Sequence, residues 1–276
     1  MTVGICGLGL IGGSMAKAYS AAGHTVLGYD KNDAALGYAS LAGITSGTLD
    51  NTTIPDCELI FIALYPQAAV KYLDEIAPII DKKTVVIDLC GTKKEICDVG
   101  FALAERYGFT FVGGHPMAGT QYSGIKYSKE TLFKNAPMVL VPPVYDDIYF
   151  LDKIKQLLAP AMFGRITVTT AEEHDAMIAF TSQLAHVVSN AYVKSPTAPK
   201  HKGFSAGSYK DMTRVAWLNE YMWSELFLEN KEPLLFEIDQ IVKSLAEYRD
   251  AIASGDKEEL ISLLRDGRIA KEKVDG

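Results

Sequence analysis

Three glycines near the N-terminus have the spacing of a phosphate-binding loop. Gly7, Gly9 and Gly12 form a G-x-G-x-x-G sequence that follows an apolar run at 3–6 and opens a helical pattern. A second apolar run follows at 25–29, so the glycines lie inside one strand–helix–strand unit. In such a unit the glycines permit a tight turn, a close backbone approach to a pyrophosphate and close helix–strand packing. The helix N-terminus also favours phosphates. We therefore predict a dinucleotide site.

The residue that ends the second apolar run indicates which dinucleotide binds. Asp30 lies 18 residues beyond Gly12, where a carboxylate can accept hydrogen bonds from ribose hydroxyls. Its charge would repel the 2′-phosphate of NADP, so we expect NAD. An α/β turn that binds no ligand is the alternative, and a titration without NAD(H) binding would favour it. The other residues expected to line this site are Leu8, Leu10, Ile11, Leu64 and Tyr65.

Two histidines are candidates for chemistry on a second ligand. His115 follows an apolar run, at the strand ends where ligands of open α/β sheets bind. Because its side chain has little to pack against locally, we favour a catalytic role over a loop histidine bonded to a carbonyl. His186 shares one face of an apolar helix with Ser182 and Asn190. We expect this face to border a wet cleft, the alternative being a polar stripe bonded within the core.

Charged and polar residues of the later half give weaker signals. His174 and His201 lie near the ends of helical segments and are expected to face solvent. Lys210 and Arg214 share a helix face near a predicted helix N-terminus, whose dipole favours anions. An arginine can hold a carboxylate in a two-bond fork. Composition alone favours the alternative, a solvated surface face paired with Asp211.

Strand and helix patterns alternate along the first 169 residues. This alternation indicates a doubly wound, mostly parallel sheet of the Rossmann type. After Thr170, which has capping-box spacing to Glu173, only helical patterns follow. We therefore predict an α/β domain at 1–169 and an all-helical domain at 170–276. The expected strands are 3–6, 25–29, 58–64, 84–88, 109–112, 137–141 and 165–169, and the expected later helices are 170–193, 208–229, 233–253 and 256–272.

Composition argues against several other classes of protein. The net charge of −7 does not suit a general nucleic-acid surface. No apolar stretch approaches the roughly 20 residues of a membrane helix, and the N-terminus lacks the basic region of a signal peptide. We expect a cytoplasmic protein that binds neither nucleic acid nor membrane. The four cysteines lack metal-ligand spacing, which favours reduced packing residues and no metal site.

The order of these motifs resembles that of a known family. From residue 3 to about 231 the chain is similar to the prephenate/arogenate dehydrogenases of tyrosine biosynthesis. Any one motif is modest, but the ordered set is specific. The resemblance implies a Rossmann-type domain followed by a helical domain that forms the interface of a homodimer. The motifs that carry it lie at 7–14, 113–119, 182–186, 210–214, 222–223 and 227–231.

The resemblance also implies roles for single residues of the catalytic centre. His115 matches the histidine that takes the proton of the substrate's ring hydroxyl. Thr92 stands where the family commonly has a serine near that hydroxyl and the nicotinamide. His186 matches a histidine that positions the substrate, so these three residues form the expected catalytic group.

A second set of residues is implied to bind the substrate. Arg214 matches the arginine that grips its carboxylate, and Lys210 and Trp223 match residues that line its cleft. Gln121 stands where some members have a glutamate, and we place it in the same group. Ala185 replaces the proline usual before the second histidine, a change that affects mainly helix geometry.

Together these features predict the oxidative decarboxylation of prephenate with NAD. Arogenate dehydrogenase is the nearest alternative, because arogenate carries an ammonium that needs an acidic or carbonyl partner. A β-hydroxyacid or imine reductase would use a helix-borne lysine or aspartate as proton donor, and the His115 motif argues against it. A non-catalytic NAD-binding regulator is the third alternative. Tyrosine could act as an inhibitor by competing at the active site.

Overall fold

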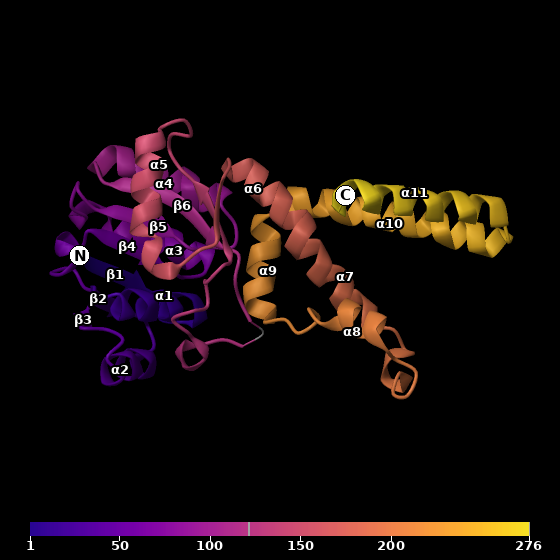
Figure 1. The fold of residues 1–276 in the computed structure, drawn as a ribbon, viewed down its shortest axis with the longest axis horizontal. Helices are drawn as coiled ribbons and strands as arrows, with labels where there is room; N and C mark the ends of the chain where they lie inside the picture. Colours follow the sequence, from indigo (N-terminus) through magenta and orange to yellow (C-terminus); the bar gives the residue numbers. More distant parts are fainter. Residues whose placement is uncertain (121, 276) are drawn as a thin grey trace.

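The computed structural model describes residues 1–120 and 122–275, and its first half is built on one sheet (Figure 1). The strand order is β3-β2-β1-β4-β5-β6-β7-β8, and every neighbouring pair is parallel except β6 and β7. This confirms the predicted Rossmann-type, mostly parallel sheet. The strands are β1 (Thr2–Cys6), β2 (Thr25–Tyr29), β3 (Gly47–Thr48), β4 (Leu59–Ile62), β5 (Val85–Asp88), β6 (Thr110–Pro116), β7 (Pro137–Val141) and β8 (Arg165–Val168).

Both faces of the sheet are covered by helices. Along β4, Leu59 and Phe61 belong to one apolar cluster, and Ile60 and Ile62 belong to the cluster on the other face. A central parallel strand needs such an apolar run without polar alternation, because neither of its faces meets water. The covering helices are α1 (Leu10–Ala21), α2 (Asp33–Leu41) and α5 (Ile148–Leu157) on the first cluster, and α3 (Pro66–Ile76) and α4 (Lys94–Tyr107) on the second.

All elements described after β8 are helical. Thr170 caps the first of them, since its Oγ1 accepts from the backbone N–H of Glu173 at 3.1 Å. The single helix predicted at 208–229 is wrong: the side chain of Asn219 caps a new helix, so the chain breaks into two. The helices are α6 (Ala171–Ile178), the π-helical turn Ala179–Leu184, α7 (Ala185–Tyr192), α8 (Gly207–Thr213), α9 (Glu220–Glu229), α10 (Lys231–Ser254) and α11 (Lys257–Asp275).

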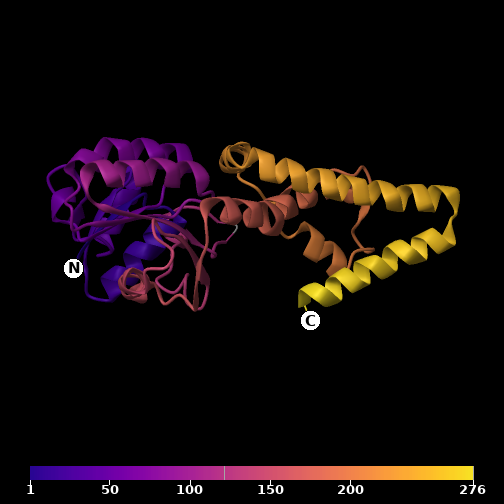
Figure 2. The same cartoon turned by 90° about the horizontal axis from the view of Figure 1, so that it is seen from above.

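The last two helices extend away from the sheet and diverge from their shared turn (Figures 1 and 2). In α10 only Leu234 and Ala251 are buried. Among the described residues, no helix has the length and apolar character needed to cross a membrane. The large apolar side chains that α10 and α11 leave exposed include Leu235, Phe236, Val242, Leu245, Ile252, Ile261, Leu264 and Ile269.

Candidate active site

The three glycines after β1 each meet a different steric requirement. Gly7 has φ +87°, and a Cβ there would lie 2.4 Å from the carbonyl oxygen of Ala63. A Cβ on Gly12 would lie 1.8 Å from the carbonyl oxygen of Gly7, so this position fixes the packing of α1 on the loop. Gly9 has no atom within 4 Å of its ideal Cβ. It therefore opens onto free space beside the backbone, as the approach of a pyrophosphate requires.

The start of α1 and the end of β2 complete this cradle. Gly9 caps α1 without any side-chain bond, and the first turn, which begins with Leu10 and Ile11, carries no acidic residue. Its N–H groups and positive dipole end are therefore available to an anion. Asp30 accepts from the backbone N–H of Leu8 at 2.7 Å with one carboxylate oxygen and from that of Asn32 at 2.9 Å with the other. Each oxygen keeps a lone pair for a ribose hydroxyl.

Two further predicted residues follow the neighbouring strand β4. Leu64 contacts the glycine loop, because a Cβ on Gly7 would lie 3.0 Å from its side chain. Tyr65 is the N-cap residue of α3 and is 48% exposed. The structure thus brings the predicted cofactor-binding residues to one edge of the sheet, and this edge fits a dinucleotide.

His115 lies at the carboxyl end of β6 and is joined to a second histidine from the helical half. Its Nδ1 is 2.9 Å from Nε2 of His174, whose Nδ1 lies 2.7 Å from a carboxylate oxygen of Asp175. His174 is only 2% exposed, so the expectation that it faces solvent is wrong. His201 is partly exposed, and its ring stacks on that of Tyr209. The sequence signal that could have revealed His174 is the acidic residue directly after it.

The pKa of His115 lies well below its usual value. Burial is the main cause, followed by the neighbouring His174 and the cation of Lys93. Lys93 is fully buried and forms an ion pair with Asp88 at the end of β5. Asp88 also accepts from the backbone N–H of Gly114 at 3.2 Å, which ties β5 to β6 next to the histidine. His115 is therefore neutral at neutral pH and is held on a rigid strand end.

Thr92 follows β5 and contacts the helical half through a carboxyl group. Its Oγ1 donates to Oε2 of Glu229 at 2.6 Å. Burial raises the pKa of Glu229 to about 7, while the bond from Thr92 opposes this and nearby carboxylates add to it. Oε1 of Glu229 is buried and has no hydrogen-bond partner among the described residues. Sequence reasoning missed Glu229, because its partner is 137 positions away.

Acidic residues of the helical half also sit on helix N-termini of the sheet-bearing half. Asp175 accepts from the backbone N–H groups of Lys93 and Lys94, at 2.8 and 2.9 Å, at the start of α4. Glu225 accepts from the backbone N–H of Gln67 at 2.9 Å at the start of α3. A carboxylate at a helix N-terminus satisfies free N–H groups and complements the dipole. These contacts hold the helical half over the carboxyl edge of the sheet.

His186 belongs to a separate group in the helical half. Its Nδ1 bonds to the carbonyl oxygen of Ser182 at 2.8 Å, and its ring lies 3.9 Å from that of Trp223. Burial lowers the pKa of His186, with the cation of Arg214 as a further cause, which places Arg214 nearby. Lys210 is exposed in the last turn of α8. The predicted helix start is confirmed, since α8 begins at Gly207, but Arg214 caps the C-terminal end of this short helix and so does not lie near its N-terminus.

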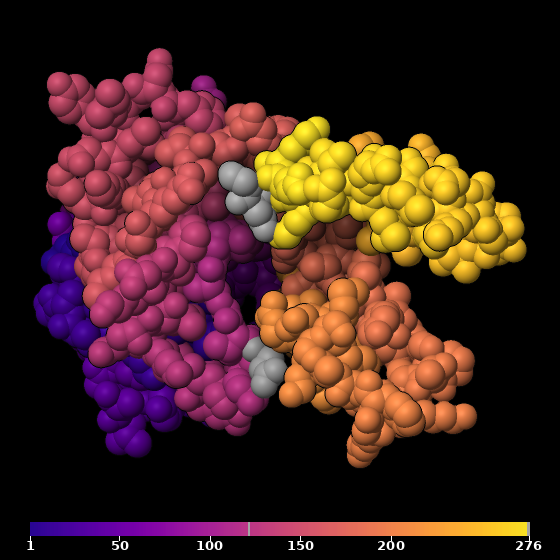
Figure 3. All heavy atoms as spheres, turned by 45° about the vertical axis from the view of Figure 1, so that its right-hand side comes forward, coloured from indigo at the N-terminus to yellow at the C-terminus, as the bar shows by residue number. Residues whose placement is uncertain are grey.

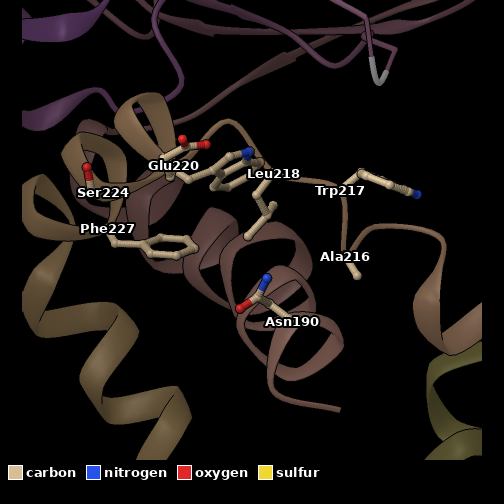
Figure 4. Close-up of a pocket in the computed structure, with 8 residues that line it drawn as sticks. Asn190, Ala216, Trp217, Leu218, Glu220, Ser224 and Phe227 are labelled. Atoms are coloured by element: carbon tan, nitrogen blue, oxygen red, sulfur yellow. The ribbon is translucent and has the colours of Figure 1, made fainter. Parts of the chain in front are cut away.

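A hollow of about 410 Å³ has Trp223 among its lining residues, and Figure 4 shows it with Asn190, Glu220 and Phe227 labelled. Figure 3 also shows the surface hollowed between the sheet-bearing half and the helices. His174 and His186 are twelve positions apart on one nearly continuous helical run, or about 18 Å at the rise of an α-helix. His115 therefore meets this helical run at its His174 end, and of the predicted site residues Trp223 is the one among those that line the hollow. The residues that line the hollow are Asn190, Ala216, Trp217, Leu218, Glu220, Trp223, Ser224 and Phe227.

Two remaining predictions concern the substrate group and metals. Gln121 lies outside the described residues. Within residues 1–120 and 122–275 there is no cluster of three or more residues suited to hold a metal ion. All four cysteines are buried and free, as expected for packing residues.

Comparison with known proteins agrees with this arrangement. The family model for the prephenate dehydrogenase nucleotide-binding domain matches residues 15–167, and that for the prephenate dehydrogenase dimerization domain matches residues 170–266. A prephenate dehydrogenase of Bacillus subtilis is 30% identical over 286 residues, which cover 100% of this chain and 76% of the relative.

Two solved structures share the fold over nearly the whole chain. Prephenate dehydrogenase from A. aeolicus, in complex with hydroxyphenyl propionate and NAD+, has a TM-score of 0.84 and 29% identity, covering 100% of this chain and 98% of that one. Arogenate dehydrogenase from Synechocystis has a TM-score of 0.81 and 26% identity, covering 99% and 100%. With both family models matched in order and an edge that fits a dinucleotide, the chain belongs to the prephenate dehydrogenase family and is an NAD-dependent dehydrogenase.

Proposed function

We propose that the protein converts prephenate to 4-hydroxyphenylpyruvate and CO2 with reduction of NAD, a step of tyrosine biosynthesis. The observation that carries this proposal is the neutral, strand-held His115, which contacts the helical run that also carries His186, with Arg214 near His186. We infer that the substrate lies between these groups, which suits a small dianion with a hydroxyl at one end and a carboxylate at the other. The homologues support the family, and the choice of substrate is our inference.

The chemistry requires one base and an anion-binding end. His115 accepts the proton of the ring hydroxyl as the C4 hydride leaves, and loss of the ring carboxylate as CO2 then gives an aromatic ring. When bound, NAD accepts the hydride. Because aromatisation supplies the driving force, the protein's part is to position groups and to offset charge. Only a neutral imidazole can accept a proton, and the low pKa of His115 keeps its ring neutral.

The other predicted residues receive supporting roles. We place Thr92 near the ring hydroxyl, with its proton directed to Glu229 so that its lone pairs face the substrate. We place Arg214 and Lys210 at the substrate's carboxylates, and His186 stacked on Trp223 as a wall that orients the side-chain end.

The cofactor and the assembly follow from two further features. Asp30 would face the 2′-phosphate of NADP, so NAD should be strongly preferred. α10 and α11 leave several large apolar side chains exposed, and exposed apolar patches often mark interaction sites, so we propose a homodimer formed by the helical domain. We propose the domain boundary at 169/170.

The experiment that tests the proposal follows NADH absorbance with prephenate and with arogenate, each with NAD and with NADP. We expect turnover of prephenate with NAD, and a His115→Asn variant that binds NAD but loses most of kcat. His24→Asn is the matched control, because His24 lies between α1 and β2, at the opposite edge of the sheet. NAD(H) binding without turnover of either substrate would indicate a non-catalytic regulator. Normal turnover by His115→Asn would show that His115 is not the catalytic base.

Arogenate is the second candidate substrate, and one observation favours it. Glu220 lines the hollow beside Trp223 together with Asn190, and a carboxylate next to an aromatic ring is a suitable partner for an ammonium. If arogenate is the substrate, Glu220→Gln should raise its KM while leaving the KM for NAD unchanged. The ratio of kcat/KM on the two substrates decides between them.

A further inference from the structure

The pair His174 and Asp175 lies directly behind the proposed base. Both residues belong to α6 of the helical half, and both are buried, at 2% and 5% exposure. Nδ1 of His115 contacts Nε2 of His174 at 2.9 Å, and Nδ1 of His174 contacts Asp175 at 2.7 Å. Packing alone does not require a buried histidine and a buried carboxylate to be linked by hydrogen bonds to His115.

The three residues Asp175, His174 and His115 form a hydrogen-bonded series, and the carboxylate of Asp175 determines where the protons of the two rings lie. Ionised Asp175 has no proton to donate, so Nδ1 of His174 must carry one. The pKa of His174 is lowered, chiefly by burial, so the ring is neutral and its Nε2 holds a lone pair. Nδ1 of His115 must then be the donor to that lone pair. Because His115 is neutral as well, its only remaining lone pair is on Nε2.

We propose that His174 and Asp175 are positioning residues for the base: they fix His115 in the tautomer whose Nε2 is free to take a proton. The proposal rests on the proposed function, in which His115 is that base. When Nε2 takes the proton, Nδ1–H of His115 remains bonded to His174, so the imidazolium forms without rearrangement. A carboxylate that orients a histidine base in this way is familiar from hydrolase triads.

The surroundings of the series agree with this role. Apart from Asp175 itself, the charged groups that face these residues are Lys93 before α4 and Asp88 at the end of β5, which pair with each other. Asp175 also accepts the two backbone N–H groups at the start of α4. Its carboxylate is therefore fixed from the sheet-bearing half, and the direction of the histidine series is fixed with it.

Three variants of His174 separate positioning from packing. His174→Phe keeps an aromatic ring but loses the hydrogen bonds to His115 and Asp175. We expect its kcat to fall about 10- to 100-fold, which is part of what a positioned base contributes. The KM for NAD should be unchanged. His174→Gln can still offer an acceptor to Nδ1 of His115, so it should recover part of the loss. His174→Asn keeps a donor to Asp175 but does not reach His115, so it should lose kcat with little loss of stability. It also keeps the test valid if the phenylalanine variant fails to fold.

A spectroscopic readout addresses the tautomer directly. In protein with 15N-labelled histidine, the ring signals of His115, assigned with His115→Asn, should show a proton on Nδ1 and none on Nε2 at neutral pH. In His174→Phe and His174→Asn these signals should shift toward a mixture of tautomers. His24→Asn should leave the signals of His115 unchanged.

The outcomes distinguish this proposal from the proposed function. If His115→Asn is inactive while His174→Phe and His174→Asn keep the wild-type kcat and tautomer, the positioning role is refuted and the base remains. If the wild-type protein turns over neither substrate but the tautomer depends on His174, the proposed function fails and the series remains. If the ring proton of His115 in the wild-type protein lies on Nε2, the proposed role of His174 and Asp175 is refuted, whatever the enzyme activity.

Discussion

Replacing Glu229 by glutamine should make the protein more stable at alkaline pH. Burial raises the pKa of Glu229 from 4.5 to about 7 in the folded protein. Between these pH values the folded state holds a proton that the unfolded state has released, so the free energy of unfolding falls as pH rises from about 4.5 to about 7. Above pH 7 the folded protein carries a half-buried carboxylate. Glutamine keeps an acceptor for Thr92 Oγ1 and removes that charge.

The size of the effect follows from the change in pKa. At about 1.4 kcal/mol per pH unit, the change would correspond to about 3 kcal/mol for a group shielded from water. Because Glu229 retains some solvent contact, we halve this value, which gives a gain of about 1.5 kcal/mol for Glu229→Gln at alkaline pH. The gain should shrink toward pH 5, where wild-type Glu229 is protonated in the folded state.

Urea denaturation followed by tryptophan fluorescence measures this gain, because Trp217 and Trp223 both lie in the helical half. The matched control is Glu225→Gln, one turn earlier on the same helix. Its carboxylate sits on the N-terminus of α3 and favours the folded state, so the control should lose stability at alkaline pH. A loss of stability in Glu229→Gln at about pH 8, or a difference from wild type that does not change with pH, would refute the reasoning.

Three further predictions concern the glycine loop, the core of the helical half and the proposed subunit interface. Gly12→Ala should not give stable folded protein, whereas Gly9→Ala should fold and bind NAD at least about tenfold more weakly, as measured by thermal denaturation and calorimetric titration. Asn230→Ala should cost about 2–3 kcal/mol in urea denaturation, because the side chain of Asn230 donates two buried hydrogen bonds of 2.8 Å; a smaller cost would mean that water replaces them. Phe236→Glu should give monomers in analytical ultracentrifugation, since Phe236 is 61% exposed on α10, and an unchanged sedimentation coefficient would place the interface elsewhere.

The features that sequence predicts well are those set by neighbours in the chain. The glycine loop depends on three positions within six residues, and Asp30 directly follows the next strand, so the local structure of this loop could be predicted in detail. The strand predicted at 109–112 forms as well, but it continues to Pro116, so that His115 is its next-to-last residue. In each case an apolar run fixes the element.

The features that sequence predicts poorly depend on distant partners. His174 was expected to face solvent because its partner His115 is 59 positions away and comes from a different domain. The break before α9 was missed because the helical pattern continues through 214–218 and only the side chain of Asn219 starts a new helix. The position of Arg214 at a helix end follows from this break.

Asp175 takes part in two sets of contacts, and these link the packing of the helical half on the sheet to the chemistry of His115. Its oxygens hold the first turn of α4 and, through the adjacent imidazole, set the proton on the base. A hinge motion that lifts the helices from the sheet must break the first contact and disturb the second at once. In a molecule opened in this way His115 would lose its fixed tautomer, so the proposed proton transfer requires the contact between Asp175 and the start of α4 to be intact.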